Sequence, residues 1–210
     1  MSFTIIPVTS FSQNCSLIWC DQTRQAAWVD PGGEANRLIQ TATEHNVQIT
    51  KILLTHGHLD HVGAALELAN HYEVEIIGPQ IADQFWLDHL PEQSQMFGLA
   101  HCEAFIPHHW LSHGDMVTIG EQELEVRHCP GHTPGHIVFI NHQQRLAWVG
   151  DVLFHGGIGR TDFPQGNYEA LIHSIKNELL TLPDDYQFIP GHGPSSTIGN
   201  ERTRNPFLKG

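Results

Sequence analysis

Four side chains of the kind that commonly binds metal ions lie close together in residues 55–61. They are His56, His58, Asp60 and His61. His56 and His58 are two residues apart, so an extended backbone directs both imidazoles to the same side. Asp60 and His61 follow at the expected start of a helix and turn toward a second centre. Because imidazole and carboxylate groups bind zinc, iron and manganese, the segment can hold one ion and supply part of the ligand set of another.

Three later segments have a similar form, in which a histidine or an aspartate adjoins a glycine near the end of an apolar run. They span residues 130–136, 149–151 and 189–194, and their candidate ligands are His132, Asp151 and His192. Together with the first segment they provide five histidines and two aspartates. That number suits two ions that share one bridging carboxylate. We interpret His136, at the start of a strand, as a supporting residue and not as a ligand.

These residues must be placed by the ends of strands and the starts of helices. Residues 49–54 form an apolar run, which predicts a strand buried on both faces that ends at the first histidines. Apolar residues at helical spacing from Val62 to Ala69 predict a helix that begins just after His61. Asn167 predicts the N-cap of a later helix.

The remaining pattern indicates a mixed α/β fold. Further strands are predicted at residues 3–8, 16–20, 26–30, 74–77, 116–119, 124–128, 136–140, 146–149 and 187–189, and a further helix at residues 81–90. Strands before, between and after helices indicate a layered α/β architecture. No Ser-, Gly- or Pro-rich linker divides the chain, so we expect one domain over residues 1–210. The histidines of residues 78–113 follow no pattern that assigns them a role.

Composition limits the classes of partner. The chain has 10 Lys and Arg against 23 Asp and Glu, a net charge of −13, which repels a phosphate backbone and argues against a nucleic-acid partner. The apolar runs are too short to span a membrane, and the N-terminus lacks the features of a secretory signal. We therefore expect no membrane association and a cytoplasmic location. The cysteines, expected to be reduced, are Cys15, Cys20, Cys102 and Cys129.

The motif Thr-His-X-His-X-Asp-His at residues 55–61, with the three later candidate ligands in order, resembles the metallo-β-lactamase superfamily. The resemblance covers essentially the whole chain. It implies a four-layer αββα sandwich, with two mixed β-sheets face to face and helices outside. The implied ligands are His56, His58 and His132 for one divalent ion, Asp60, His61 and His192 for a second, and Asp151 as the bridge. Zinc is the expected metal, with iron or manganese as alternatives.

Two further segments, residues 159–164 and 201–207, look like the short form of the type II glyoxalases, the hydroxyacylglutathione hydrolases. True β-lactamases carry a cysteine where this chain has Asp151. The long form of the glyoxalases adds a C-terminal helical domain, which we do not expect in residues 1–210. The resemblance implies hydrolysis of a small-molecule glutathione thioester, S-D-lactoylglutathione, to D-lactate and glutathione, with Asp60 and Asp151 as catalytic residues.

Other assignments stay open at this stage. Arg160 lies in a glycine-rich loop and could bind a substrate carboxylate through two hydrogen bonds, or it could pair with the nearby Asp162.

A persulfide dioxygenase of the same superfamily shares the Gly-Arg-Thr-Asp-Phe run but works through a single iron. A non-catalytic zinc-binding module would retain the ligands and hydrolyse no thioester. Metal analysis and a thioester assay separate these functions.

Overall fold

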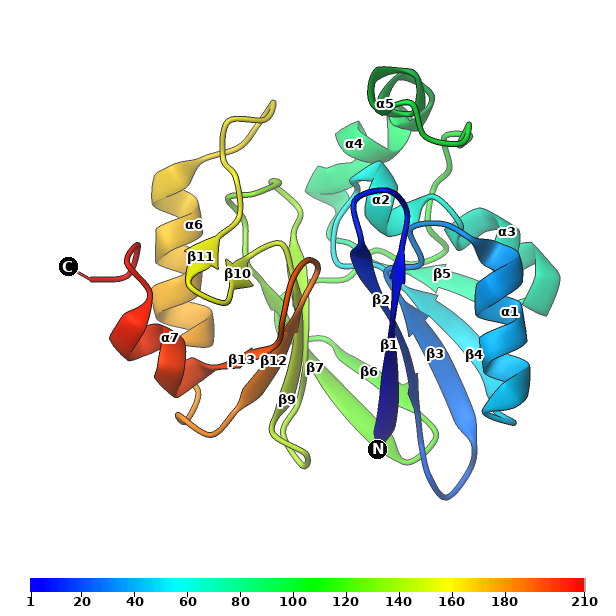
Figure 1. The fold of residues 1–210 in the computed structure, drawn as a ribbon, viewed down its shortest axis with the longest axis horizontal. Coiled ribbons are helices and arrows are strands. Elements are labelled where there is room, and N and C mark those ends of the chain that lie inside the picture. Colours follow the sequence, from blue (N-terminus) through cyan, green and yellow to red (C-terminus); the bar gives the residue numbers. More distant parts are fainter. Residues whose placement is uncertain (210) are drawn as a thin grey trace.

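A computed structural model describes residues 1–209 and shows two β-sheets face to face, with helices on both outer sides (Figure 1). The first sheet contains β1 (Ser2–Val8), β2 (Gln13–Trp19), β3 (Gln25–Val29), β4 (Gln48–Leu53) and β5 (Glu75–Ile77), in that spatial order. β2 is antiparallel to both of its neighbours, β1 and β3, whereas β3, β4 and β5 run parallel. The sheet is therefore mixed, as the sequence predicts.

The second sheet is also mixed. Its spatial order is β13 (Ser196–Thr197), β12 (Gln187–Pro190), β9 (Leu146–Gly150), β8 (Ile137–Asn141), β7 (Gln122–His128) and β6 (Met116–Ile119). Only β12 and β9 pair in parallel. A separate hairpin joins β10 (Leu153–Phe154) to β11 (Gly157–Ile158).

Three apolar layers hold the sandwich together. Between the sheets, Ile18 and Leu53 of the first sheet belong to one buried cluster with Phe139 and Trp148 of the second. Outside the first sheet lie α1 (Ala35–Glu44) and α3 (Ala65–Tyr72), and outside the second lie α6 (Tyr168–Ser174), its π-helical continuation Ile175–Leu179, and α7 (Ile198–Arg204) (Figure 1). Burial of this apolar surface is the main source of stability. The four-layer αββα prediction is confirmed.

The helix expected after His61 differs from the prediction. A four-residue helix, α2 (Leu59–Val62), already contains Asp60 and His61, and the longer α3 starts only at Ala65. The break has a tertiary cause: the N–H of Ala64 donates to the carbonyl of Pro31 at 2.9 Å, which turns the backbone away from the helix axis. Asp60 and His61 are thereby held together on one short helix.

The segment after β5 contains more helix than the sequence indicates. A 3₁₀ turn (Ile81–Asp83) leads into α4 (Gln84–Asp88), and a further helix, α5 (Leu90–Phe97), follows. Proline at the second position of α5 does not interrupt it, because the first turn of a helix needs no backbone donor there. The predicted N-cap of α6 is confirmed, since the Asn167 side chain accepts from the N–H of Ala170.

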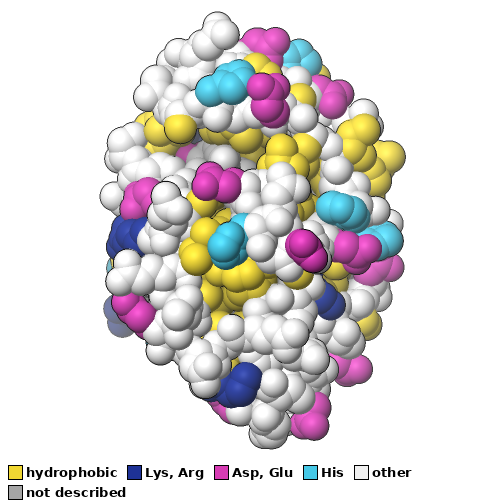
Figure 2. All heavy atoms as spheres, turned by 90° about the vertical axis from the view of Figure 1, so that its right-hand side faces the viewer, with side chains coloured by type: hydrophobic (Ala, Val, Ile, Leu, Met, Phe, Trp, Pro, Cys, Tyr) yellow, Lys and Arg dark blue, Asp and Glu magenta, His cyan; other side chains and the backbone are white. Residues whose placement is uncertain are grey.

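Surface charge follows the composition. Figure 2 shows the flank that lies on the right in Figure 1, where acidic side chains visibly outnumber lysine and arginine. No helix within residues 1–209 has the length and apolar character needed to cross a bilayer. All four cysteines are buried and unbridged, as expected.

Candidate metal centre

The seven candidate ligands converge at one end of the sandwich, although they come from four separate segments of the sequence. His56 and His58 follow β4, and Asp60 and His61 lie on α2. The other three follow strands of the second sheet: His132 after β7, Asp151 after β9 and His192 after β12. Strand ends from both sheets thus supply the site, which is why ligands far apart in the sequence can meet.

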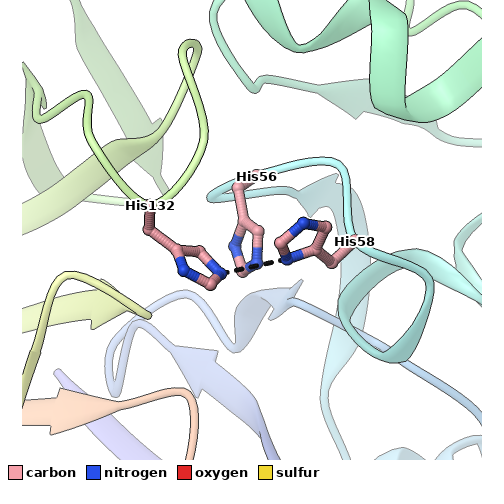
Figure 3. Close-up of side chains that lie close together, drawn as sticks. All are labelled: His56, His58 and His132. Atoms are coloured by element: carbon pink, nitrogen blue, oxygen red, sulfur yellow. Dashed lines mark hydrogen bonds between the residues drawn. The ribbon is translucent and has the colours of Figure 1, made fainter. Parts of the chain in front are cut away.

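His56, His58 and His132 form the first group (Figure 3). One ring nitrogen from each lies within 4.8 Å of the other two, and Nε2 of His132 is 3.0 Å from Nδ1 of His58. Burial, reinforced by the neighbouring imidazoles, holds the pKa values of His56 and His58 well below their usual range. These rings are therefore neutral and offer lone pairs, as metal binding requires.

Asp60, His61 and His192 form the second group. Nε2 of His192 lies 3.1 Å from Oδ2 of Asp60, and Nε2 of His61 lies 3.8 Å from the same oxygen. Burial alone would raise the pKa of Asp60, but the adjacent His61 and His192 hold it below its usual range. The group thus combines an ionised carboxylate with two imidazoles.

Asp151 lies between the two groups. Its Oδ1 is 3.4 Å from Nε2 of His61, and its Oδ2 is 3.6 Å from Nε2 of His132 and 3.7 Å from Nε2 of His192. A carboxylate in this position faces both groups at once. The geometry therefore suits a bridging ligand.

Unpaired buried atoms indicate that the site fits metal ions. Within the described residues, Nε2 of His56, Nε2 of His61 and Oδ1 of Asp151 are buried and have no hydrogen-bond partner. Leaving such atoms unpaired is costly. Divalent cations would satisfy them, and the donor set of nitrogen and carboxylate oxygen suits zinc, iron or manganese.

In most of the candidate histidines, the second ring nitrogen is held by the surrounding protein, which fixes the direction of the first. Four of the five histidines show this arrangement, and its partners are Thr55 Oγ1 for His56 at 3.0 Å, Asp30 Oδ2 for His61 at 3.0 Å, the Arg160 carbonyl for His132 at 2.7 Å, and the Phe11 carbonyl for His192 at 3.2 Å. Such outer contacts orient metal-binding histidines and set their tautomer. The free nitrogens therefore point into the cluster.

Two supporting carboxylates were missed by sequence reasoning. Asp30 directly follows β3 and accepts from the N–H and hydroxyl of Thr55 as well as facing His61. The only sequence signal was its position before a Pro-Gly-Gly turn. Asp83 is fully buried and accepts from the Gly57 N–H at 2.8 Å, the Thr133 hydroxyl at 2.8 Å and the Gly135 N–H at 2.5 Å. It thereby joins the two loops that carry the first group.

His136 lies beside the cluster and supports it. Its Nε2 accepts from the N–H of Asp151 at 3.0 Å, and its ring stacks on His56 with centroids 4.5 Å apart. This agrees with the interpretation of His136 as a supporting residue. The bond fixes the backbone from which the Asp151 side chain projects.

Arg160 has two roles in the structure. Its backbone carbonyl orients His132, while its guanidinium makes two hydrogen bonds to Asp162 at 2.9 and 2.8 Å and lies over the ring of Phe163. The ion pair predicted as an alternative is therefore present. Arg160 also lines a cavity of about 360 Å³ that opens onto Asp60, Asp151 and three of the candidate histidines. It remains a candidate for binding an anionic substrate.

Comparisons with known proteins agree with this geometry. The chain is 54% identical over 209 residues to hydroxyacylglutathione hydrolase GloC of Haemophilus influenzae, with 99% of this chain and 98% of that protein covered. The solved structure of the BLEG-1 B3 metallo-β-lactamase matches with a TM-score of 0.92 at 34% identity and full coverage of both chains. TTHA1623, solved in a di-iron-bound form, matches with a TM-score of 0.89 at 32% identity, covering 98% of this chain and 100% of that one.

The family assignment rests on the chain as a whole as well as on the site. A family model described as the metallo-beta-lactamase superfamily matches residues 8–192, a range that contains all seven candidate ligands. The family-model match, the two-sheet sandwich and the relatives above all indicate the same family. The chain belongs to the metallo-β-lactamase superfamily.

Proposed function

We propose that this protein is a dinuclear metal-dependent thioester hydrolase that converts S-D-lactoylglutathione to D-lactate and glutathione. The observation that carries the proposal is the pair of three-residue groups with Asp151 between them. The relative from H. influenzae, named a hydroxyacylglutathione hydrolase, supports the substrate class. In this proposal zinc is the expected metal, and the di-iron form of TTHA1623 makes iron the first alternative.

In the proposed assignment, His56, His58 and His132 would hold one ion, and Asp60, His61 and His192 would hold the other. Asp151, whose two oxygens face both groups, would contribute a carboxylate to each. Two such ions would lower the pKa of a shared water toward ~7 and polarise the acyl oxygen.

The protein's own groups orient the substrate. Arg160, at the rim of the cavity, provides a guanidinium for a carboxylate of the glutathione part. The aromatic rings around the cavity exclude water from the reacting bond, which strengthens electrostatic interactions there. The leaving group is a thiolate, whose conjugate acid has a pKa near that of cysteine, ~8.5. It therefore departs without a general acid, and no protein side chain needs to protonate it.

The completeness of the second group argues against a single-iron dioxygenase. Asp60, His61 and His192 already lie within 4.8 Å of one another. This second set of three side chains is arranged as a second ion would require. The dinuclear hydrolase therefore accounts for more of the buried polar side chains.

Metal analysis and a hydrolysis assay on one preparation test the proposal. We expect two ions per chain and release of glutathione from S-D-lactoylglutathione, and we expect Asp151→Ala to lower kcat/KM at least ~10²-fold. Exposed Asp115, outside the site, provides the matched control Asp115→Ala. One iron per chain with oxygen uptake on glutathione persulfide would support the dioxygenase instead. Turnover of a β-lactam without thioester hydrolysis would favour the activity in the name of BLEG-1.

A further inference from the structure

The cavity over the metal centre has two aromatic walls that differ in charge. Its floor is formed by candidate ligands of both groups, and its volume is about 360 Å³. Apart from the candidate ligands, Arg160 is the only charged residue among the described residues that line it. The two walls therefore offer different chemistry to the two halves of a substrate.

The wall beside the first group carries the Arg160 guanidinium, which is paired with Asp162. The ring of Trp86 lies 4.4 Å from His58, and the ring of Phe163 lies 5.1 Å from the same imidazole. The Arg160 guanidinium sits 4.4 Å from the centre of the Phe163 ring. This wall suits the part of a substrate that bears carboxylates.

The wall beside the second group is apolar. Phe11, from the loop between β1 and β2, meets Phe97 at the end of α5 edge to face, with centroids 6.0 Å apart. The ring of Phe154 lies 6.4 Å from His192, and the Phe11 carbonyl binds Nδ1 of the same histidine. The rings of Phe11 and Phe97 remain 44% and 42% exposed, and both line the cavity. Exposed neighbouring rings of this kind mark an apolar binding surface.

Resting on the proposed thioester hydrolysis, we propose that Phe11, Phe97 and Phe154 form an acyl subsite that selects thioesters with large apolar, above all aromatic, acyl groups. With the carboxylate-bearing thiol part at the Arg160 wall, the acyl part lies against this opposite wall. The methyl group of a lactoyl substrate covers little of three aromatic rings. A phenyl ring in the same position buries far more apolar surface and can pair edge to face with Phe97.

Two thioesters with the same thiol part test the subsite. For the two-metal enzyme we expect kcat/KM to be at least ~10-fold higher for S-D-mandeloylglutathione than for S-D-lactoylglutathione, after division by the rates of their hydroxide-catalysed hydrolysis. Phe97→Ala should lower kcat/KM roughly 10-fold for the mandeloyl substrate and less than about 3-fold for the lactoyl substrate. Phe97→Leu should restore part of the loss, because leucine retains apolar bulk.

The neighbouring Met96 provides the matched control. It is apolar and 77% exposed, and it does not line the cavity. Met96→Ala should leave both rates unchanged. Equal turnover of the two thioesters by the unaltered enzyme, or an equal loss on both in Phe97→Ala, would overturn the acyl subsite. In the second case the wall binds the thiol part that the substrates share.

Binding of the product acids separates this inference from the proposed reaction. D-mandelate and D-lactate carry the acyl half alone, and calorimetric titration into the two-metal protein measures their affinities. We expect mandelate to bind at least ~10-fold more tightly and Phe97→Ala to remove that difference. If neither thioester is hydrolysed, the proposed function fails, and these titrations still decide the subsite: equal affinities overturn it.

Discussion

Four of the five candidate metal-binding histidines are oriented by a contact to their other ring nitrogen. Asp30, Thr55 and two backbone carbonyls hold the outer nitrogens of four histidines. Two of the four contacts are made by backbone carbonyls, so they require no particular side chain at those positions. They also show why a ligand motif alone does not define the geometry of a site.

Arg160 offers a test at the scale of a single side chain. Its ion pair with Asp162 is exposed on both sides, and exposed pairs contribute little to stability. We therefore expect Arg160→Ala to leave the melting temperature unchanged and to raise KM roughly 10-fold with little change in kcat. Arg204→Ala is the control, because Arg204 of α7 is exposed and does not line the cavity, and its replacement removes the same charge. A lower melting temperature with unaltered kinetics would assign Arg160 to the fold.

Asp83 makes a prediction about pH. Burial raises the pKa of this carboxyl to about 6, despite three hydrogen bonds that favour ionisation. The folded protein therefore binds this proton more tightly than the unfolded chain, where the pKa is ~3.9. The contribution of Asp83 to the free energy of unfolding should fall as pH rises from about 4 to about 6, by on the order of 3 kcal/mol.

Denaturant unfolding of the metal-free protein and of Asp83→Asn measures this effect, because asparagine does not titrate. The difference in unfolding free energy should shift in favour of the variant across that pH interval. A constant difference would contradict the raised pKa. Because Asp83 also joins the loops of the first group, the variant should bind metal about 10- to 100-fold more weakly.

At the scale of the elements, the loop after β12 leaves no room for a side chain before His192. A Cβ on Gly191 would lie 2.1 Å from Oδ1 of Asp151 and 2.5 Å from Cε1 of His61. We expect Gly191→Ala to displace one of these residues, to lower the metal content from two ions to about one and to remove most of the activity. Gly157→Ala is the control, since its Cβ would come no closer than 3.7 Å to Phe154. Full metal content in Gly191→Ala would show that the loop can move aside.

Long apolar patterns predicted the elements well, and tertiary contacts account for what they missed. The strand predicted at residues 49–54 is present at Gln48–Leu53, although Thr50 and Lys51 are only partly buried, and the N-cap at Asn167 is confirmed. The split between α2 and α3 depends on Pro31, more than thirty residues earlier in the chain. The role of Asp83 likewise depends on Gly57 and Gly135, which reach it only after folding. No local pattern carries that information.

For the molecule as a whole, metal ions would connect the two sheets. Asp60 and His61 come from the first sheet's side, and Asp151 and His192 follow strands of the second. Ions that bind only the folded protein stabilise it by about 2.7 kcal/mol at 100 times Kd. For a chain of this size, this corresponds to a rise in melting temperature of roughly 5–10 °C.

Calorimetry of the chelated and the reloaded protein checks this expectation. The melting temperature should fall on chelation and recover on reloading. Asp151→Ala serves as the control, because its melting temperature should respond less to added metal. Identical melting temperatures with and without bound metal would show that the sheets need no ions to stay together.

The parallel pairing of β12 with β9 has a consequence for biosynthesis. It places His192 beside Asp151, and the N–H of Asn14 ties the same loop to the first hairpin through the Gly191 carbonyl. A ribosome adding ~5–20 residues per second would make the His56–His58 pair roughly 7–27 s before His192. During that interval the nascent chain presents a partial chelating site. The complete set of candidate ligands therefore exists only after β12 has joined the second sheet, late in synthesis.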